Sequence, residues 1–187
     1  MKKRKWLFVV AIFISCIIIA IRIIGMRSYS DSETRIYTKA KEGHAWAQNI
    51  LGVRFALGKG VPRDYDIAVY WFHKAAEQGY PSSETNLGEM YYDGKSVSQS
   101  YEKAAELFHR AAEKDYSLAQ YYLGQMYYEG VGVPQDLLTA YKWFSIARTH
   151  SLLGEPEILY TKEKLTPEEV ERARVLIGEW LEEHQHR

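Results

Sequence analysis

One short motif in the chain has a spacing that could support catalysis. Ser100-Tyr101-Glu102-Lys103 matches S-x-x-K, in which a lysine one helical turn away activates a nucleophilic serine in penicillin-binding enzymes and β-lactamases. The companion motifs S-D-N and K-T-G are missing from the sequence. A helix that begins after Ser100 would use this serine as its N-cap and leave Lys103 on the surface. We therefore predict no enzymatic activity, and a hydrolase acting on peptidoglycan or β-lactams is the disfavoured alternative.

Residues that could bind a metal or form disulfides are sparse. Cys16 is the only cysteine, so no disulfide framework is possible. Among the six histidines, His73 and His109 lie 36 residues apart and have no cysteine or carboxylate in ligand register. His184 and His186 lie near the C-terminus. We predict no metal, no cofactor and no small-molecule substrate.

The distribution of charge argues against nucleic-acid binding. The chain has 24 Lys and Arg and 24 Asp and Glu, but residues 1–30 hold six of the cations and no acid. The remaining residues thus carry 18 cations against 24 acids and lack the basic excess that a nucleic-acid-binding face needs.

A period of 36 residues runs through the middle of the chain. It places a Leu-Gly pair, a later glycine, a valine, an alanine and a phenylalanine in the same register three times, and the period has no insertions. Such a period is typical of stacked helix pairs. The recurring positions are Leu51, Leu87 and Leu123; Gly52, Gly88 and Gly124; Gly58, Gly94 and Gly130; Val61, Val97 and Val133; Ala68, Ala104 and Ala140; and Phe72, Phe108 and Phe144.

The third copy, residues 119–150, shows how each repeat should fold. Its first part has apolar residues at helical spacing and ends at Gly130, which is suited to a left-handed C-cap. Asp136 can cap a second helix with its own apolar stripe. Gly124 would let the two helices approach closely. In the second copy, Ser96 replaces a loop glycine and Ser100 replaces the capping aspartate.

The recurring pattern A-x-x-x-L-G-x-x-Y-x-x-G-x-G-V-x-x-D-x-x-x-A-x-x-W-F-x-x-A-A-x-x-G resembles the Sel-one-like repeat (SLR) family, a relative of the tetratricopeptide repeat. The resemblance implies an all-α fold, an α/α superhelix of helix pairs used for protein–protein contacts. We expect repeats at 47–82, 83–118 and 119–150, a degenerate cap at 35–46, and capping helices with a tail at 151–187.

The N-terminal segment predicts a membrane anchor. Residues 2–5 are all basic. The stretch from Trp6 to Ile24 is almost wholly apolar, and as a helix it would be roughly 28 Å long. We predict an uncleaved transmembrane helix over residues 1–27 and a linker at 28–34. The positive charges before the span place the N-terminus in the cytoplasm, so the repeats would face the periplasm from the inner membrane. A cleaved, secreted form and a periplasmic form lipid-anchored at Cys16 remain alternatives.

Aligned on the L-G-x-x-Y register, the resemblance also implies which residues line a binding groove on the first helix of each repeat. These positions follow the spacing i, i+3, i+7, i+10, which is one stripe of a helix. Aromatic anchors among polar residues suit recognition of a protein. The predicted groove consists of Trp46, Asn49, Val53 and Ala56; Ser82, Thr85, Glu89 and Tyr92; and Leu118, Tyr121, Gln125 and Tyr128.

These features favour a non-enzymatic, membrane-anchored protein-binding module of the bacterial envelope. Its partner would be a protein, either a toxin or effector or a protein of the envelope. The module would then act as an inhibitor or immunity protein or as an adaptor, and the sequence leaves this choice and the partner's identity open.

Overall fold

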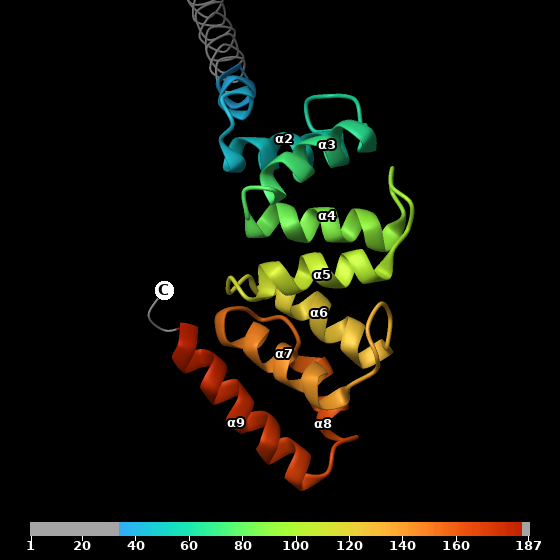
Figure 1. The fold of residues 1–187 in the computed structure, drawn as a ribbon, viewed down its shortest axis with the longest axis vertical. Helices are drawn as coiled ribbons and strands as arrows, with labels where there is room; N and C mark the ends of the chain where they lie inside the picture. Colours follow the sequence, from blue (N-terminus) through green and yellow to red (C-terminus); the bar gives the residue numbers. More distant parts are fainter. Residues whose placement is uncertain (1–33, 185–187) are drawn as a thin grey trace, which may run out of the picture.

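The computed structural model describes residues 34–184, and these residues form an all-helical solenoid. Three helix pairs follow one another along its long axis (Figure 1). The pairs are α2 (Ala45–Leu57) with α3 (Tyr65–Ala76), α4 (Pro81–Asp93) with α5 (Tyr101–Ala112), and α6 (Ser117–Glu129) with α7 (Leu137–His150). The predicted α/α repeat architecture is thus confirmed.

Each pair is delimited by the caps that the sequence suggested. Gly58, Gly94 and Gly130 end the first helices in the left-handed conformation. The second helix of the third pair begins at Asp136, whose carboxylate accepts the N–H groups of Leu138 and Thr139. The equivalent caps are Asp64, which accepts from Ile67 N, and Ser100, which accepts from Lys103 N.

The two helices of a pair meet where a glycine faces a phenylalanine. A Cβ atom added to Gly124 would lie 2.7 Å from a ring carbon of Phe144, and the corresponding distances are 2.5 Å from Gly52 to Phe72 and 2.7 Å from Gly88 to Phe108. All three phenylalanines are buried. Only glycine allows the ring to lie this close to the opposite helix, which confirms the packing role inferred for Gly124.

The N-terminal end of the solenoid is covered by one more helix, residues 34–41. Its Ala40 is buried, and Gln48 of α2 donates a hydrogen bond to the Ala40 carbonyl. Tyr37 packs edge-on against Trp71 of α3, with ring centroids 6.4 Å apart. This helix shields the side of the first pair that has no repeat before it.

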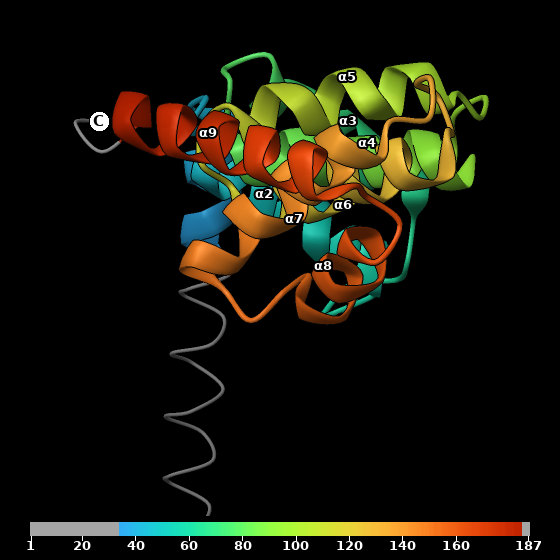
Figure 2. The ribbon, with the colours of Figure 1, turned by 90° about the horizontal axis from the view of Figure 1, so that it is seen from below.

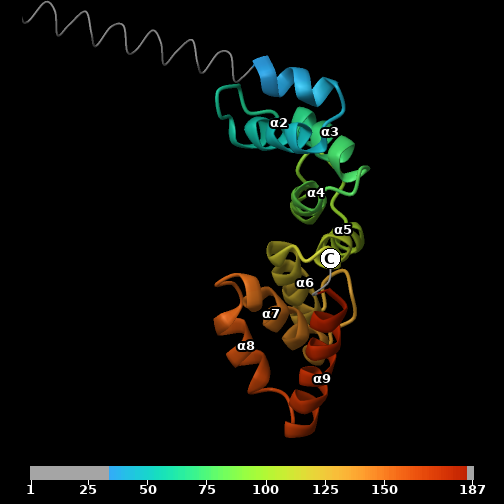
Figure 3. The same cartoon turned by 90° about the vertical axis from the view of Figure 1, so that its left-hand side faces the viewer.

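Two helices close the C-terminal end. α8 (Glu155–Lys162) and α9 (Pro167–His184) pack on different sides of α7 (Figure 3). Trp180 of α9 packs edge-on against Trp143 of α7, and the Nε2 atom of His184 lies 3.2 Å from the Glu113 carbonyl at the end of α5. The C-terminal part of α9 therefore contacts both α7 and the end of α5. Figure 2 shows α9 crossing in front of the stacked helix pairs. Residues 182–184, expected to belong to a loose tail, continue the helix.

The predicted N-terminal transmembrane helix and the inner-membrane, periplasm-facing location are contradicted. No helix within residues 34–184 is both long and apolar enough to cross a bilayer. A span needs about 20 mostly apolar residues, whereas α9, the longest described helix, has 18 residues and many charges. The segment 1–27, on which the prediction was based, lies outside the described residues.

Candidate protein-interaction surface

A cavity of about 320 Å³ opens between the first helices of the second and third repeats. We call it the central cavity. It brings together three residues of the predicted groove, Glu89, Tyr92 and Gln125, because α4 and α6 lie side by side with their predicted stripes facing the same way. The other residues that line it are Asp93, Phe108, Tyr122, Met126 and Glu129.

The polar groups of the central cavity are held by few internal bonds. The Tyr122 hydroxyl donates to Glu89, and the Gln125 amide donates to the Tyr121 hydroxyl at 3.1 Å. Asp93 forms an ion pair with Lys95 at 2.7 Å. Within residues 34–184, no cation lies within ion-pair distance of Glu89 or Glu129. The charge of Lys95 also acts on Glu89 without an ion-pair contact. The cavity therefore presents carboxylates, Glu89 and Glu129, that have no ion-pair partner among the described residues.

The negative character of this surface is also visible in its tyrosines. Burial raises the pKa of the Tyr92 hydroxyl, and the nearby Glu129 carboxylate raises it further. Burial also raises the pKa of Tyr122 well above its ordinary value, and its hydrogen bond to Glu89 acts in the same direction. Both hydroxyls stay protonated at neutral pH, so Tyr122 remains a donor to Glu89.

A second, smaller cavity of about 230 Å³ lies between α2 and α4, and we call it the flanking cavity. Two predicted groove residues, Val53 and Ala56, line it together with Glu89, which borders both cavities. Lys95 reaches over this cavity, with its ammonium 5.8 Å from the centre of the Tyr65 ring. The flanking cavity therefore already holds a cation of the chain's own.

Two predicted groove residues on the first helix of the third repeat, Tyr121 and Tyr128, are in contact with the segment around α8. The Tyr121 hydroxyl donates to Glu157 of α8 at 3.0 Å, and the Lys164 ammonium donates to the Tyr128 hydroxyl at 2.5 Å and lies 4.5 Å from the centre of that ring. Glu157 and Lys164 come 36 residues after the tyrosines that they contact, which is one repeat length. The segment around α8 thus lies where the first helix of a fourth repeat would lie, and it contacts Tyr121 and Tyr128.

The other predicted groove residues lie outside the central cavity. In the first repeat, Trp46 is 41% exposed, whereas the Asn49 side chain accepts hydrogen bonds from Ser83 and Asn86 of the next first helix. Ser82 and Leu118 are half-buried near the starts of α4 and α6. Thr85 is 1% exposed, and its hydroxyl donates to the Pro81 carbonyl, so it offers no side chain to a partner.

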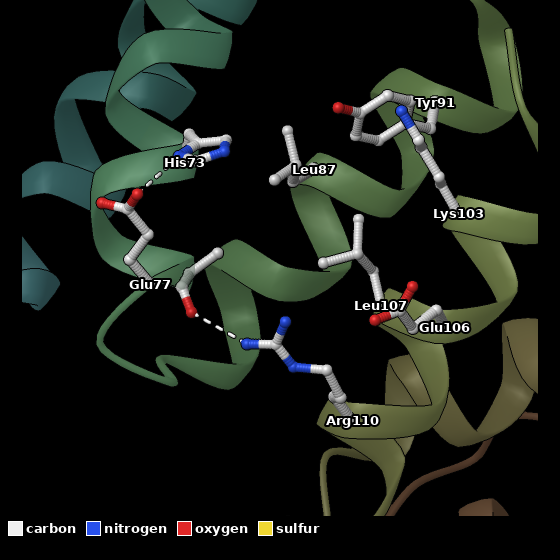
Figure 4. Close-up of a pocket in the computed structure, with 9 residues that line it drawn as sticks. His73, Glu77, Leu87, Tyr91, Lys103, Glu106, Leu107 and Arg110 are labelled. Atoms are coloured by element: carbon white, nitrogen blue, oxygen red, sulfur yellow. Dashed lines mark hydrogen bonds and ion pairs between the residues drawn. The ribbon is translucent and has the colours of Figure 1, made fainter.

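A third hollow lies on the opposite side of α4, where α3 and α5 approach each other (Figure 4). Leu87 and Leu107 form its floor, and charged side chains form its rim. The rim charges are largely engaged within the chain: His73 lies 3.3 Å from Glu77, and Arg110 donates to the Ala76 carbonyl. The predicted groove residues do not extend to this hollow.

The serine–lysine motif does not form a catalytic pair. The Ser100 hydroxyl accepts the Lys103 N–H at 3.3 Å and donates to the Glu102 carboxylate at 3.1 Å. The Lys103 ammonium instead lies 5.1 Å from the centre of the Tyr91 ring. Ser100 therefore acts as a helix cap, and the Lys103 side chain lies against Tyr91 instead of the Ser100 hydroxyl.

Five residues of the central cavity were missed by the sequence analysis of the groove. Tyr122 directly follows Tyr121 of the predicted stripe, and its hydroxyl donates to Glu89 on the neighbouring helix. Asp93 and Glu129 occupy the same repeat position, directly after Tyr92 and Tyr128. This recurrence of an acid was a signal in the sequence, whereas nothing in the sequence indicated that the buried residues Phe108 and Met126 line the cavity.

Comparisons with known proteins agree with the repeat architecture. The model of the Sel1 repeat family matches residues 47–80, 81–116 and 117–150. The chain is similar to the crystal structure of a protective antigen present in uropathogenic Escherichia coli strains that displays an SLR fold, with 35% identity, a TM-score of 0.73, and 79% of this chain and 32% of that chain covered. It is also similar to a Sel1 repeat protein from Oxalobacter formigenes, with 30% identity, a TM-score of 0.62, and 70% of this chain and 54% of that chain covered. The chain thus spans about a third and about half of these two proteins, and no curated protein matches it.

Proposed function

Because the chain belongs to the Sel1 repeat family, as the match over residues 47–150 shows, we propose that it is a non-enzymatic module that binds a protein through the first-helix face of its repeats. The observation that carries this proposal is the central cavity. It is open, it combines aromatic rings with acidic and amide groups, and it lies where Glu89, Tyr92 and Gln125 were predicted to form the groove.

The geometry favours the second repeat over the third as the principal contact. Tyr92 lines an open cavity, whereas Tyr121 and Tyr128 are held by Glu157 and Lys164. An aromatic anchor in a partly enclosed pocket is the kind of residue that dominates binding energy at protein interfaces. A partner that docks on this face would therefore depend most on Tyr92.

Two roles fit such a module. As an inhibitor or immunity protein, it would cover the active surface of a toxin or effector. As an adaptor, it would hold another protein without blocking it. Both need the same binding surface, and an assay of the partner's own activity in the bound state separates them.

The test uses the purified chain as bait and measures the affinity of the partner that it captures. Replacing Tyr92 by alanine should weaken binding by about 2 kcal/mol, or roughly thirtyfold, as for an aromatic hot spot. Val175→Ala is the matched control, because Val175 is an exposed apolar residue on α9, away from this face. Unchanged affinity in a folded Tyr92→Ala variant would exclude the central cavity as the contact.

A further inference from the structure

The chain itself shows how its groove tyrosines receive a basic side chain. Lys164 lies over Tyr128 with its ammonium 4.5 Å from the ring centre and donates to the hydroxyl at 2.5 Å. Tyr92 occupies the same repeat position as Tyr128, one repeat earlier. Among the described residues no cation lies over the ring of Tyr92 or Tyr122.

The surroundings of Tyr92 suit a cation better than those of Tyr128. Glu89, Asp93 and Glu129 all line the central cavity beside it. Of these carboxylates, Asp93 forms an ion pair with the partly exposed Lys95, and the charge of Lys95 also acts on Glu89. The face of an aromatic ring attracts a cation, and carboxylates a few ångströms away add Coulomb attraction where water is partly excluded.

The apolar part of the cavity suits the stem of such a side chain. Phe108 and Met126 contribute apolar surface to its wall. A lysine or arginine side chain buries its methylene groups against apolar surface while its charged end reaches polar groups. The volume of about 320 Å³ accommodates a long side chain of this kind.

We propose that the central cavity binds a lysine or arginine side chain presented by the protein partner, so that the partner docks with a basic segment. This inference rests on the proposed protein-binding function and specifies the chemistry of its ligand. Tyr92 supplies the ring face, Glu129 and Glu89 supply the negative charge, and Phe108 and Met126 hold the aliphatic stem.

The probes for a direct test are three short ligands that differ in the side chain. They are the Nα-acetyl methylamides of lysine and arginine and of norleucine, which matches the lysine stem without the charge. Binding is followed by the NMR signal of the Met126 methyl group in the full chain, at millimolar ligand. The lysine and arginine ligands should shift this signal in a saturable manner, and added salt should weaken the effect because it screens the charges. The norleucine ligand should give no saturable shift.

Variants then identify the groups responsible. Glu129→Gln combined with Tyr92→Leu should weaken lysine binding at least tenfold, since it removes a charge and the ring face. Glu102→Gln combined with Tyr160→Leu is the matched control, because it removes an exposed acid and an exposed ring elsewhere and should leave binding unchanged.

Three results would overturn the inference: no shift of the Met126 signal with either basic ligand, an equal shift with norleucine, or unchanged lysine binding in the cavity variant. These results differ from a failure of the proposed function. If the captured partner loses affinity for Tyr92→Ala but also binds without any lysine or arginine at the contact, the groove assignment stands and the basic ligand is excluded. If that partner binds the Tyr92→Ala variant with unchanged affinity, the proposed function itself fails.

Discussion

The second and third repeats share one scaffold, yet the equivalent tyrosines on their first helices have different neighbours. In both, a glycine faces a buried phenylalanine, and a left-handed glycine ends the first helix. Tyr92 of the second repeat borders an open cavity, whereas Tyr128 of the third is occupied by Lys164. The comparison indicates that one repeat position can have different surroundings in successive repeats, because the next segment of the chain differs.

The same two repeats also differ in the buried polar residue at one equivalent position of their first helices, Glu84 and Gln120. In the second repeat, Glu84 is fully buried, and its carboxylate accepts from Arg110 at 2.6 Å and from Lys114 at 2.8 Å. In the third repeat, the equivalent residue is Gln120, whose amide donates to the Ala112 carbonyl at 3.2 Å. At this position the second repeat thus has a buried carboxylate with two cationic partners, whereas the third repeat has a neutral amide.

The largest expected effect tests the part of the scaffold that the two repeats share. Gly124→Leu should lower the free energy of unfolding by about 3 kcal/mol or more, because even a Cβ atom there would lie 2.7 Å from Phe144 and over-packing is costly. Gly88→Leu should have a similar effect, measured by urea unfolding of each variant. Gly130→Ala, which strains a left-handed turn and places a Cβ atom 3.0 Å from the Gln135 Cβ, should cost about 1 kcal/mol. A large difference between Gly88→Leu and Gly124→Leu would contradict the equivalence of the two cores.

The next effect concerns the buried carboxylate of the second repeat. Glu84→Ala should lower the free energy of unfolding by about 2–3 kcal/mol, which is less than for a fully buried pair because Arg110 and Lys114 remain partly hydrated. Glu84→Gln should cost about 1 kcal/mol, since an amide keeps hydrogen bonding. Gln120→Ala in the third repeat is the comparison, and urea unfolding measures all three. If Gln120→Ala destabilises more than Glu84→Ala, the carboxylate does not strengthen the second repeat.

The repeat register predicted the architecture because it encodes local requirements. Gly124 and Phe144 must be paired whatever the neighbouring repeats are, and Gly130 and Asp136 cap helices through their own backbone geometry. The prediction of the N-terminal transmembrane helix was wrong for the described structure, and it rested on the apolarity of one segment, with no recurring pattern to support it.

The groove was predictable only in part. Tyr92, which was predicted to line the groove, borders the central cavity. The burial of Thr85 and the contact of Lys164 with Tyr128 depend on neighbours from other parts of the chain. The coverage by α8 was the hardest feature to foresee, because this helix continues the spacing of the repeat while its residues no longer follow the pattern. Glu157 and Lys164 reveal their role only once the helices are placed in space.

A smaller effect is expected from removing the contacts of Glu157 and Lys164 with Tyr121 and Tyr128. Glu157→Ala combined with Lys164→Ala should lower the free energy of unfolding by about 1 kcal/mol, since it deletes two partly exposed polar contacts. It should also make Tyr121 and Tyr128 more accessible, which photo-oxidative labelling of tyrosines followed by mass spectrometry can measure. Labelling of Tyr92 serves as the reference and should not change. Unchanged labelling of Tyr121 and Tyr128 would mean that α8 covers them by packing alone.

The smallest effect concerns the caps of the two second helices and depends on pH. Burial disfavours the charged form of Asp136, but hydrogen bonds from Thr139 and Leu138 outweigh it and lower the pKa of Asp136 below the ordinary 3.8. Because the folded value is depressed, this cap stabilises the fold above the unfolded pKa and loses that contribution as the pH falls through the folded value. Ser100, the cap of the second repeat, carries no such charge.

Asp136→Ser should therefore change the free energy of unfolding at pH 7 by no more than about 0.5 kcal/mol, since serine and aspartate cap helices about equally well. Below pH 4 the wild type loses the contribution of its charged cap and the variant does not, so the difference between them should shrink or change sign. Urea unfolding at pH 7 and pH 3 measures this, and Ser100→Asp should give the second repeat the same acid sensitivity. A constant difference between wild type and Asp136→Ser across this range would show that the carboxylate charge contributes nothing to the third repeat, and that the two caps are equivalent despite their chemistry.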